Sequence, residues 1–231
     1  MNSTLQIADC GDAAVRVSCR ASDPEQAWRT VHALSDWLEA CRHPHHIRGT
    51  IATYDAVLVE FDAALTDHDA VRALVEIGAA RSRPQNRSPK QFAIPVVYGG
   101  EHGPDLLRVA EQQGLDADEV VAIHTAQPLL MRCYGSPAGA PMLDGPRFPH
   151  PVPRLPSPRP HVGAGAVAVA GRQAVVSARP APGGWCVLGR TPKTLVDVTR
   201  TPLAAFAPGD TFRFFPIRPE EWPDYEGTLD E

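Results

Sequence analysis

Residues 182–192 read PGGWCVLGRTP, and this stretch characterises the second half of the chain. Its apolar run, residues 185–189, lies between a glycine pair and a proline, which is the pattern of a short strand bounded by turns. Comparable apolar runs stand at residues 167–170, 174–177 and 211–217. Several short strands separated by turn signals predict a small β-barrel or sandwich.

Upstream of these runs, prolines interrupt the chain. Nine of the 24 prolines lie between Pro137 and Pro160, which predicts an extended loop because proline removes a backbone donor. Before this loop the pattern predicts two short helices. One begins near Gly103-Pro104 and ends at Gly114, and the other begins at an Asp116/Glu119 capping box and runs to His124.

The first half of the chain alternates between strand and helix patterns. Asp23 can accept from the helix backbone, Pro24 fits the first helical position, and Gln26 can close a capping box. The predicted order is strand, helix, strand, strand, helix, which is most of a split βαβ, ferredoxin-like sandwich. These elements cover residues 13–19, 23–38, 49–53, 57–61 and 67–79.

A polar, proline-containing segment at residues 81–91 is interpreted as a linker. We therefore predict an α+β ferredoxin-like domain over residues 1–85 and a mainly β domain over residues 86–231. The strand predicted at residues 92–98 either closes the first sheet or opens the second domain.

Composition limits the function classes. The 231 residues carry a net charge of -5, from 22 Lys+Arg and 27 Asp+Glu, which is not the basic footprint of a nucleic-acid binder. The five cysteines are widely spaced with no CxxC pair, so reduced thiols in a cytoplasmic protein are expected. A signal peptide and an apolar run long enough for a membrane span are both missing from the pattern.

The chain resembles the family of the 5-oxoprolinase B subunit, also known as allophanate hydrolase subunit 1. The resemblance rests on segments in the family order along nearly the whole chain, of which 182–192 is the most specific. The others are IPVVYGGEHGPDL at 94–106, VAIHTA at 121–126, PR at 158–159, AGAVAVAGRQ at 164–173, PGD at 208–210, RFFPI at 213–217, GDAA at 11–14 and VLVEFD at 57–62.

This resemblance implies a ferredoxin-like first domain and a cyclophilin-like β-barrel second domain. It implies a heteromeric complex with the 5-oxoprolinase C-type subunit, also known as allophanate hydrolase subunit 2, and with an A-type subunit. The family reaction opens 5-oxo-L-proline to L-glutamate with ATP, while related proteins serve biotin-dependent urea carboxylase or inhibit a histidine kinase.

One segment departs from the family pattern. The family's G-F-x-P-G-F-x-Y-L falls on residues 135–143, which read GSPAGAPML. Ser136 and Ala140 replace the two phenylalanines, and Met142 replaces the tyrosine. Because aromatic side chains supply large, rigid contact area, their loss predicts an opened pocket. Three explanations stay open, namely a different or bulkier substrate, lost activity, or aromatics that served partner contact.

Two residues are candidates for proton transfer. His124, which ends a predicted helix inside a family motif, can act as a base or bind an oxyanion. Its alternative role is contact with the carbonyls of the helix end. Glu101, before a helix start, can orient a water or pair with an arginine, and its alternative is a favourable charge near that start.

Three further residues are candidates for substrate binding. Arg159 and Arg190 present planar forks that suit carboxylate or phosphate, with a structural ion pair as the equal alternative. Gln173 can hydrogen-bond an amide substrate, or it is a polar group in the barrel wall. Trp185 is interpreted as core packing rather than a stacking platform.

No nucleotide or metal site follows from the motifs. The glycine-rich stretches match neither a P-loop nor a GxGxxG fingerprint, so the place where ATP binds is unknown. The histidines at residues 43–46 have a proline among them and no nearby carboxylate, which favours a solvated turn over a metal site. The leading function is one component of an amide-hydrolysing complex, and the alternative is a non-catalytic regulatory or scaffolding protein.

Overall fold

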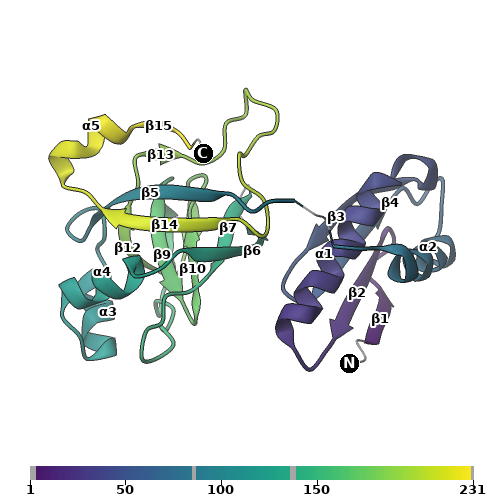
Figure 1. The fold of residues 1–231 in the computed structure, drawn as a ribbon, viewed down its shortest axis with the longest axis horizontal. Coiled ribbons are helices and arrows are strands. Elements are labelled where there is room, and N and C mark those ends of the chain that lie inside the picture. The colour runs from purple at the N-terminus through teal and green to yellow at the C-terminus, as the bar shows by residue number, and fades with distance from the viewer. Residues whose placement is uncertain (1–3, 85–86, 136–138, 230–231) are drawn as a thin grey trace. The chain divides into compact units, whose positions relative to one another are not determined.

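The structure is a computed structural model that describes residues 4–84, 87–135 and 139–229. The chain divides into two compact units, Met1–Ser88 and Pro89–Glu231. Figure 1 shows the helices and strands of each unit. Each unit has its own core, so each is described by itself.

The first unit is a four-stranded antiparallel sheet with two helices packed against it. The strand order is β1-β2-β4-β3. The elements are β1 Thr4–Asp9, β2 Ala14–Arg20, α1 Pro24–Ala40, β3 Ile47–Ala52, β4 Ala56–Phe61 and α2 His68–Arg81.

Local signals explain where the helices of this unit begin and which side they bury. Asp23 accepts from the backbone N–H of Glu25 at 3.0 Å, and Pro24 is the first residue of α1, as predicted. Asp67 caps α2 in the same way, through Ala70. The apolar stripe of α1 is buried at Val31, together with Ala27, Leu34 and Leu38. The alternation in β2 and β4 turns valines toward these helices.

The sheet differs from the expected arrangement at one edge. A ferredoxin-like sheet has the order βαββαβ, and its last strand follows the second helix. Here the strand beside β2 is β1, which forms a hairpin with it. The sequence analysis did not predict β1, whose six residues are partly buried or exposed. The strand, helix, strand, strand, helix order that was predicted is confirmed for the elements after β1.

The second unit is built around a closed barrel of seven strands in the order β10-β7-β6-β14-β5-β12-β9. This confirms the predicted β-barrel, whereas its cyclophilin-like type stays a prediction. The strand at residues 92–98 opens this unit and does not close the first sheet. The strands are β5 Gln91–Tyr98, β6 Leu129–Gly135, β7 Ala140–Asp144, β9 Ala166–Ala170, β10 Gln173–Val176, β12 Cys186–Arg190 and β14 Thr211–Pro216.

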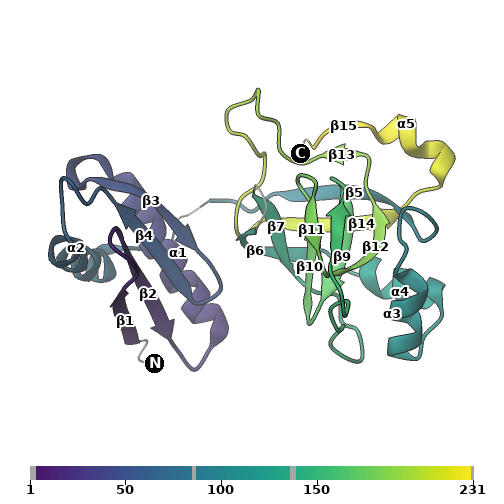
Figure 2. The same cartoon turned by 180° about the vertical axis from the view of Figure 1, so that it is seen from behind.

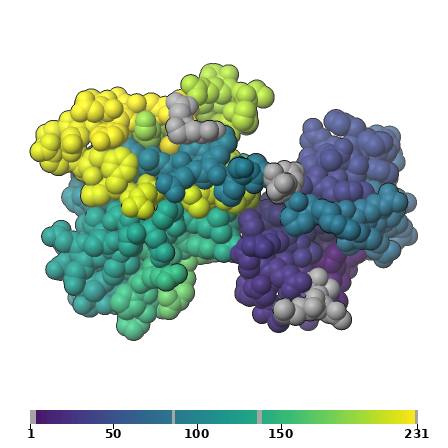
Figure 3. Space-filling view, in the orientation of Figure 1, coloured from purple at the N-terminus to yellow at the C-terminus, as the bar shows by residue number. Residues whose placement is uncertain are grey.

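The pairing of β14 with β5 is parallel and joins the two ends of the unit. The other neighbouring strands of the barrel pair antiparallel. Figure 3 shows the C-terminal segment, in yellow, lying against the blue residues of β5. This closure removes the open edges that would otherwise leave a row of unpaired backbone groups.

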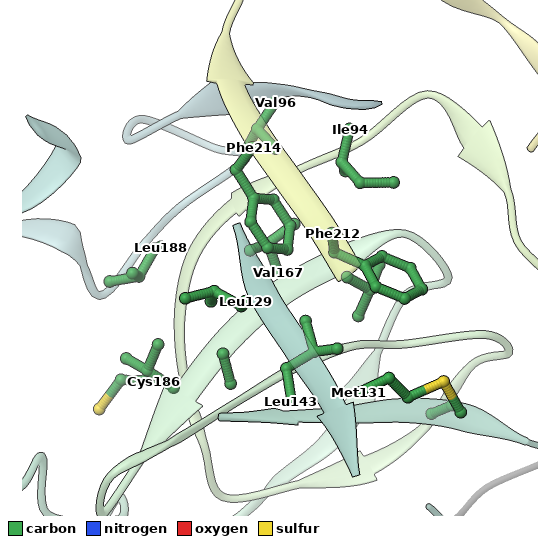
Figure 4. Close-up of a cluster of buried hydrophobic side chains, with 14 of the residues drawn as sticks. Ile94, Val96, Leu129, Met131, Leu143, Val167, Cys186, Leu188, Phe212 and Phe214 are labelled. Carbon is green, nitrogen blue, oxygen red and sulfur yellow. The ribbon is translucent and has the colours of Figure 1, made fainter. Parts of the chain in front are cut away.

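Inward side chains from all sides of the barrel form one core. Figure 4 shows this cluster, with Phe212 and Phe214 of β14 directed toward the aliphatic side chains of the other strands. The labelled members are buried, and they include Ile94, Val96, Leu129, Met131, Leu143, Val167 and Leu188. Since side chains alternate along a strand, the residues between them face outward.

The prediction of an extended loop over residues 137–160 is wrong in part, because β7 lies within it. Pro141 is tolerated in β7 for a positional reason. It lies opposite Tyr134 of β6, while the register with β10 covers only Met142 to Asp144. The missing N–H therefore removes no hydrogen bond with β10. Ser136, Pro137 and Ala138 lie outside the described residues.

Two short helices, α3 Leu106–Gln113 and α4 Ala117–Thr125, cover one end of the barrel. Gly114 ends α3 in the left-handed conformation with φ 68°. The predicted capping box is present, since Asp116 and Glu119 exchange bonds at 2.8 and 2.9 Å. The predicted start at Gly103 is displaced to Leu106, after Asp105.

Two small sheets and a C-terminal turn complete the second unit. Strand β8 Arg159–Val162 pairs with β11 Ala181–Gly183, and β13 Lys193–Thr194 pairs with β15 Gly227–Thr228. A short helix, α5 Trp222–Tyr225, precedes β15. Within the described ranges, no helix has the length and apolar character needed to cross a membrane. All five cysteines are free thiols.

Candidate functional site

A pocket of about 320 Å³ lies on the outer face of the barrel. Its floor is a row of side chains across four neighbouring strands. Met142 of β7 lies opposite Val175 of β10, Val175 lies opposite Ala168 of β9, and Ala168 lies opposite Val187 of β12. Because these four residues share one register, they form a continuous apolar surface.

The strand alternation explains why this row faces outward. Ala174 and Val176 flank Val175 in β10, and both belong to the barrel core. Val167 and Val169 flank Ala168 in the same way. Ala168 and Val187 are nevertheless buried, in a second apolar cluster with Trp185 packed against it. Something therefore covers the outer face at this point.

The cover is the small sheet of β8 and β11 and the segment that follows it. Figure 2 views this side of the barrel, with β11 drawn over β10 and β9. Val162 of β8 and residues 181–185 line the pocket. The glycine pair Gly183-Gly184 of the 182–192 motif thus forms part of the pocket wall, directly before Trp185.

One arginine faces this pocket with no ion-pair partner among the described residues. Arg154 lines the pocket, and its guanidinium carbon lies 5.9 Å from the centre of the Trp185 ring. A cation over an indole face is attracted by the ring's electron density. Trp185 therefore does more than the core packing that was predicted, since it lines the pocket and supports Arg154.

The structure places Arg159 in a structural ion pair beside the pocket. Its guanidinium makes two bonds of 2.8 Å to the carboxylate of Asp105, which is 4% exposed. The same carboxylate accepts from the backbone N–H of Val187 at 2.8 Å. The hydrogen bonds to Asp105 raise the pKa of Arg159. Through Asp105, Arg159 therefore links β8, in the pocket wall, to β12, in the pocket floor.

Arg190 also holds the backbone around the pocket. Its Nε donates to the carbonyl of Ala164 at 2.9 Å, in the connection between β8 and β9. Its guanidinium carbon lies 5.7 Å from the centre of the Trp222 ring, on which His102 stacks at 5.2 Å. Arg190 does not line the pocket, and its exposed side chain faces the C-terminal turn.

His124 lies inside the barrel end and has no solvent exposure. Its Nδ1 is 2.7 Å from the hydroxyl of Tyr98, and its ring lies 4.6 Å from that of Phe214. Burial lowers the pKa of His124 to about 3 and raises the pKa of Tyr98. Its Nε2 is buried with no hydrogen-bond partner among the described residues. The imidazole is therefore neutral and enclosed.

Glu101 and Gln173 are also separate from the pocket. The side chain of Glu101 is 91% exposed, and its carboxylate lies 3.9 Å from Nε2 of His102. Gln173 is on the outer face of the barrel, opposite Asp144 of β7, one row beyond the floor. None of the five candidates lines the pocket. Their catalytic and binding roles stay predictions.

Two positions that depart from the family pattern line the pocket. These are Ala140 and Met142, the places where the pattern has a phenylalanine and a tyrosine. Gly135 makes room for the Met142 side chain, since a Cβ at Gly135 would come within 2.6 Å of Met142 Cγ. The altered segment and the 182–192 motif, distant in sequence, therefore meet in one pocket.

The lining chemistry favours binding over proton transfer. Apart from the Trp185 indole, the polar side chains among its described lining residues are Arg154 and Ser177. No carboxylate or imidazole is among those residues. In the described part of the chain, no three His, Cys, Asp or Glu side chains are grouped to hold a metal ion. Residues 43–46 form an exposed turn, as predicted.

Sequence reasoning missed Arg154, Ser177 and the floor row. The sequence predicted a short strand from the apolar run at residues 174–177, but it did not indicate which of its side chains face outward or that this outer side is covered. Arg154 stands in a proline-rich segment that matches no motif. Only the register of four strands brings these residues together.

The fold and the pocket define a class of protein, a chain of two units whose barrel carries a pocket on its outer face. The sequence profile described as "Carboxyltransferase domain, subdomain C and D" matches residues 5–206. The chain belongs to this family. A relative, the 5-oxoprolinase B subunit of Bacillus subtilis (strain 168), is 30% identical over 237 residues, which cover 98% of each chain.

Two similar proteins of solved structure are longer than this chain. The crystal structure of TTHA0988 is 28% identical with a TM-score of 0.76, and the match covers 90% of this chain and 40% of that one. The chain therefore spans well under half of that protein. The urea amidolyase of K. lactis, 16% identical, shares the fold with a TM-score of 0.76 over 98% of this chain and 16% of its own.

Proposed function

We propose that this chain is one subunit of an ATP-dependent 5-oxoprolinase-type amidohydrolase complex. In the reaction, water cleaves the lactam C–N bond of 5-oxo-L-proline and gives L-glutamate. A related allophanate or urea-type amide is the nearest variant. The observation that carries the proposal is the similarity to a 5-oxoprolinase B subunit over 98% of both chains. The partners are the C-type subunit, also known as allophanate hydrolase subunit 2, together with an A-type subunit.

Within this complex we assign substrate binding to the outer-face pocket. An apolar floor with one arginine matches the usual composition of ligand sites, which are mostly apolar with a few placed polar groups. Since no described lining residue is a carboxylate or an imidazole, the partner subunits supply the groups that move protons. His124 and Glu101 remain candidates only if the assembled complex rearranges them.

The pocket does not fit a nucleoside triphosphate. A triphosphate is held by several cations or by a row of backbone N–H groups, and Arg154 is the one cationic side chain among the described lining residues. We therefore assign ATP to the complex and derive no step through it on this chain. The cytoplasmic location remains part of the proposal.

One observation favours a second function. A pocket whose described lining holds no group for proton transfer also suits a non-catalytic regulatory or scaffolding protein, such as an inhibitor of a histidine kinase. In that case the pocket holds a signal or a partner side chain, and catalysis is lost.

The deciding experiment is turnover by a reconstituted complex. The chain is co-expressed with the A-type and C-type proteins encoded beside it, and glutamate release from 5-oxo-L-proline is measured with and without ATP. ATP-dependent release supports the role in the enzyme. A stable complex without turnover of any tested amide rejects that role and favours the regulator.

A variant pair then tests the pocket within the complex. Ala168→Phe places a large ring on the floor, whereas Arg179→Ala removes an exposed arginine that does not line the pocket. We expect turnover to fall at least tenfold with Ala168→Phe and to stay unchanged with Arg179→Ala, provided that both variants co-purify with the partners. Equal turnover in the two complexes would reject the pocket as the substrate site.

A further inference from the structure

The pocket has an apolar half that a small polar substrate leaves unused. The floor side chains Met142, Val175 and Val187 are aliphatic or thioether groups, and Ala168 between them is the smallest. The indole of Trp185 adds an aromatic wall. Apolar surface of this kind is stabilised when an apolar group of the ligand covers it.

The size of the pocket points the same way. A volume of about 320 Å³ equals roughly ten water molecules at about 30 Å³ each. It lies at the lower end of ligand sites, about 300–1,000 Å³. Ala140 and Ala168 leave this space open, because each has a single methyl group where a larger side chain would fill it.

The charge of the pocket comes from one arginine that differs from its neighbours. Arg159 is bound to Asp105, and Arg132, on the outer face of β6, is bound to Asp144. Arg154 contacts the Trp185 ring, and no ion pair of Arg154 occurs among the described residues. A guanidinium on an aromatic face keeps its donors available for a bidentate bond to carboxylate.

We propose that the pocket selects an amide that bears a carboxylate and a branched apolar group, larger than 5-oxoproline. Arg154 binds the carboxylate, and the row Met142-Val175-Ala168-Val187 holds the apolar group. This rests on the proposed function in one respect, that the chain serves an amide hydrolase. Met142 and Ala140 determine the size of the group that is accepted.

Direct binding to the whole chain tests the apolar half. The probes are N-acetyl-L-leucine and N-acetylglycine, which share the amide and the carboxylate and differ in the branched side chain. Burial of a leucine side chain favours binding by about tenfold or more. Calorimetric titration should give N-acetyl-L-leucine a dissociation constant at least tenfold lower. Equal constants, or no binding of either probe, would overturn the proposal.

A second arm tests the role of Arg154. N-acetyl-L-leucinamide keeps the apolar group and lacks the charge, so it should bind about tenfold more weakly. Arg154→Ala should weaken N-acetyl-L-leucine by a similar factor and leave N-acetyl-L-leucinamide unchanged. Arg179→Ala is the matched control and should bind both probes like the original chain. An unchanged affinity in Arg154→Ala would remove this residue from the site.

A third arm locates the probe and separates this inference from the proposed function. Ala168→Leu should weaken N-acetyl-L-leucine at least tenfold while the thermal unfolding temperature stays close to that of the original chain. If the complex releases glutamate from 5-oxoproline but Ala168→Leu binds the probe normally, the inference fails and the proposed function stands. If the probes bind as expected but no complex forms, the role in an amide hydrolase fails, and only the ligand chemistry of the pocket stands.

Discussion

Two arginines of the same proline-rich stretch are in opposite situations. Arg159 forms an ion pair with Asp105, and we call these two residues, together with the N–H of Val187, the brace. Arg154 lines the pocket from an exposed position, which we call the mouth. Arg159 is bound by both oxygens of a buried carboxylate that also accepts from Val187. Arg154 lies over the Trp185 ring at the pocket. Both arginines directly follow a proline in the sequence, yet Arg159 shapes the pocket wall and Arg154 is available to a ligand.

The difference shows what makes an arginine available to a ligand. A bidentate bond to a buried carboxylate uses the donor geometry of the guanidinium, so a ligand must displace Asp105 to use Arg159. Breaking such a pair leaves a charge without compensation in a buried place. Stability measurements should therefore respond to the brace, and binding measurements to the mouth.

The largest effect on stability is expected for Arg159→Ala. The change leaves the carboxylate of Asp105, 4% exposed, without its partner. Because Arg159 is partly exposed, we expect the lower end of the range for broken buried pairs, about 3 kcal/mol of unfolding free energy. Urea unfolding followed by tryptophan fluorescence measures it.

The matched control is Arg218→Ala, which removes an exposed partner of Glu221 in the same unit. An exposed pair contributes about 0–1 kcal/mol, so this variant should unfold close to the original chain. If Arg159→Ala and Arg218→Ala have the same unfolding free energy, the ion pair of Arg159 with Asp105 does not stabilise the fold.

The next largest loss of stability is expected at one end of the 182–192 motif, at Gly189, and a smaller loss at the other end, at Gly183. A Cβ at Gly189 would lie 2.6 Å from both Val96 Cγ1 and the carbonyl oxygen of Val97, whereas one at Gly183 would meet Val162 Cγ2 at 3.1 Å. Gly189→Ala should destabilise by about 1–3 kcal/mol through overpacking. Gly183→Ala should lose less, because a side-chain methyl of β8 can move aside.

Thermal unfolding of the two glycine variants checks this order. The result would show that the GRTP end of the motif holds barrel strands together, while the GGW end forms the pocket wall. A larger loss in Gly183→Ala than in Gly189→Ala would reverse that assignment.

Much of the fold followed from local patterns. The helix caps at Asp23 and Asp116 were predicted from the sequence and are present. The short strands of the barrel followed from apolar runs between turns. The parallel pairing of β14 with β5 did not, because residues 91–98 and 211–216 are far apart in the sequence. Strand β7 was also missed, because it contains Pro141 and proline is typical of loops rather than strands.

The site was less predictable than the fold. Family motifs led to His124 and Arg159, but a motif does not say whether a residue faces a ligand or the interior. His124 is enclosed with Tyr98 and Phe214, and Arg159 is bound to Asp105. The floor of the pocket depends on the register of four strands, which no local pattern contains. The departures at Ala140 and Met142 were the best sequence signal for its place.

A smaller effect is expected from His124 as the pH falls. Its pKa is lowered to about 3 in the folded chain, against about 6.5 in an unfolded one. Above pH 6.5 both states are neutral, and stability is unaffected. Below it the unfolded state binds a proton that the folded state does not, so stability falls between about pH 6.5 and about pH 3.

From about pH 6.5 to about pH 5.5 the expected loss is about 1 kcal/mol. His124→Gln should be less stable overall but should not show this part of the pH dependence. Urea unfolding of both proteins at the two pH values gives the comparison. If the two proteins lose the same stability over this interval, His124 can be protonated in the folded chain, and it becomes a candidate catalytic residue again.

The smallest effect on stability is expected for Arg154→Ala. The residue is exposed, and it contacts the Trp185 ring at 5.9 Å. An exposed cation–π contact contributes about 0.5–1 kcal/mol, so the unfolding free energy should change by no more than this. Affinity for a carboxylate probe should nevertheless fall about tenfold.

A loss of stability as large as that of Arg159→Ala would make Arg154 a second part of the brace. The described lining of the pocket would then offer no cation to a ligand. Stability close to that of the original chain together with weakened binding would establish separate roles for the two arginines. Arg159 then fixes the pocket wall, and Arg154 binds the anion.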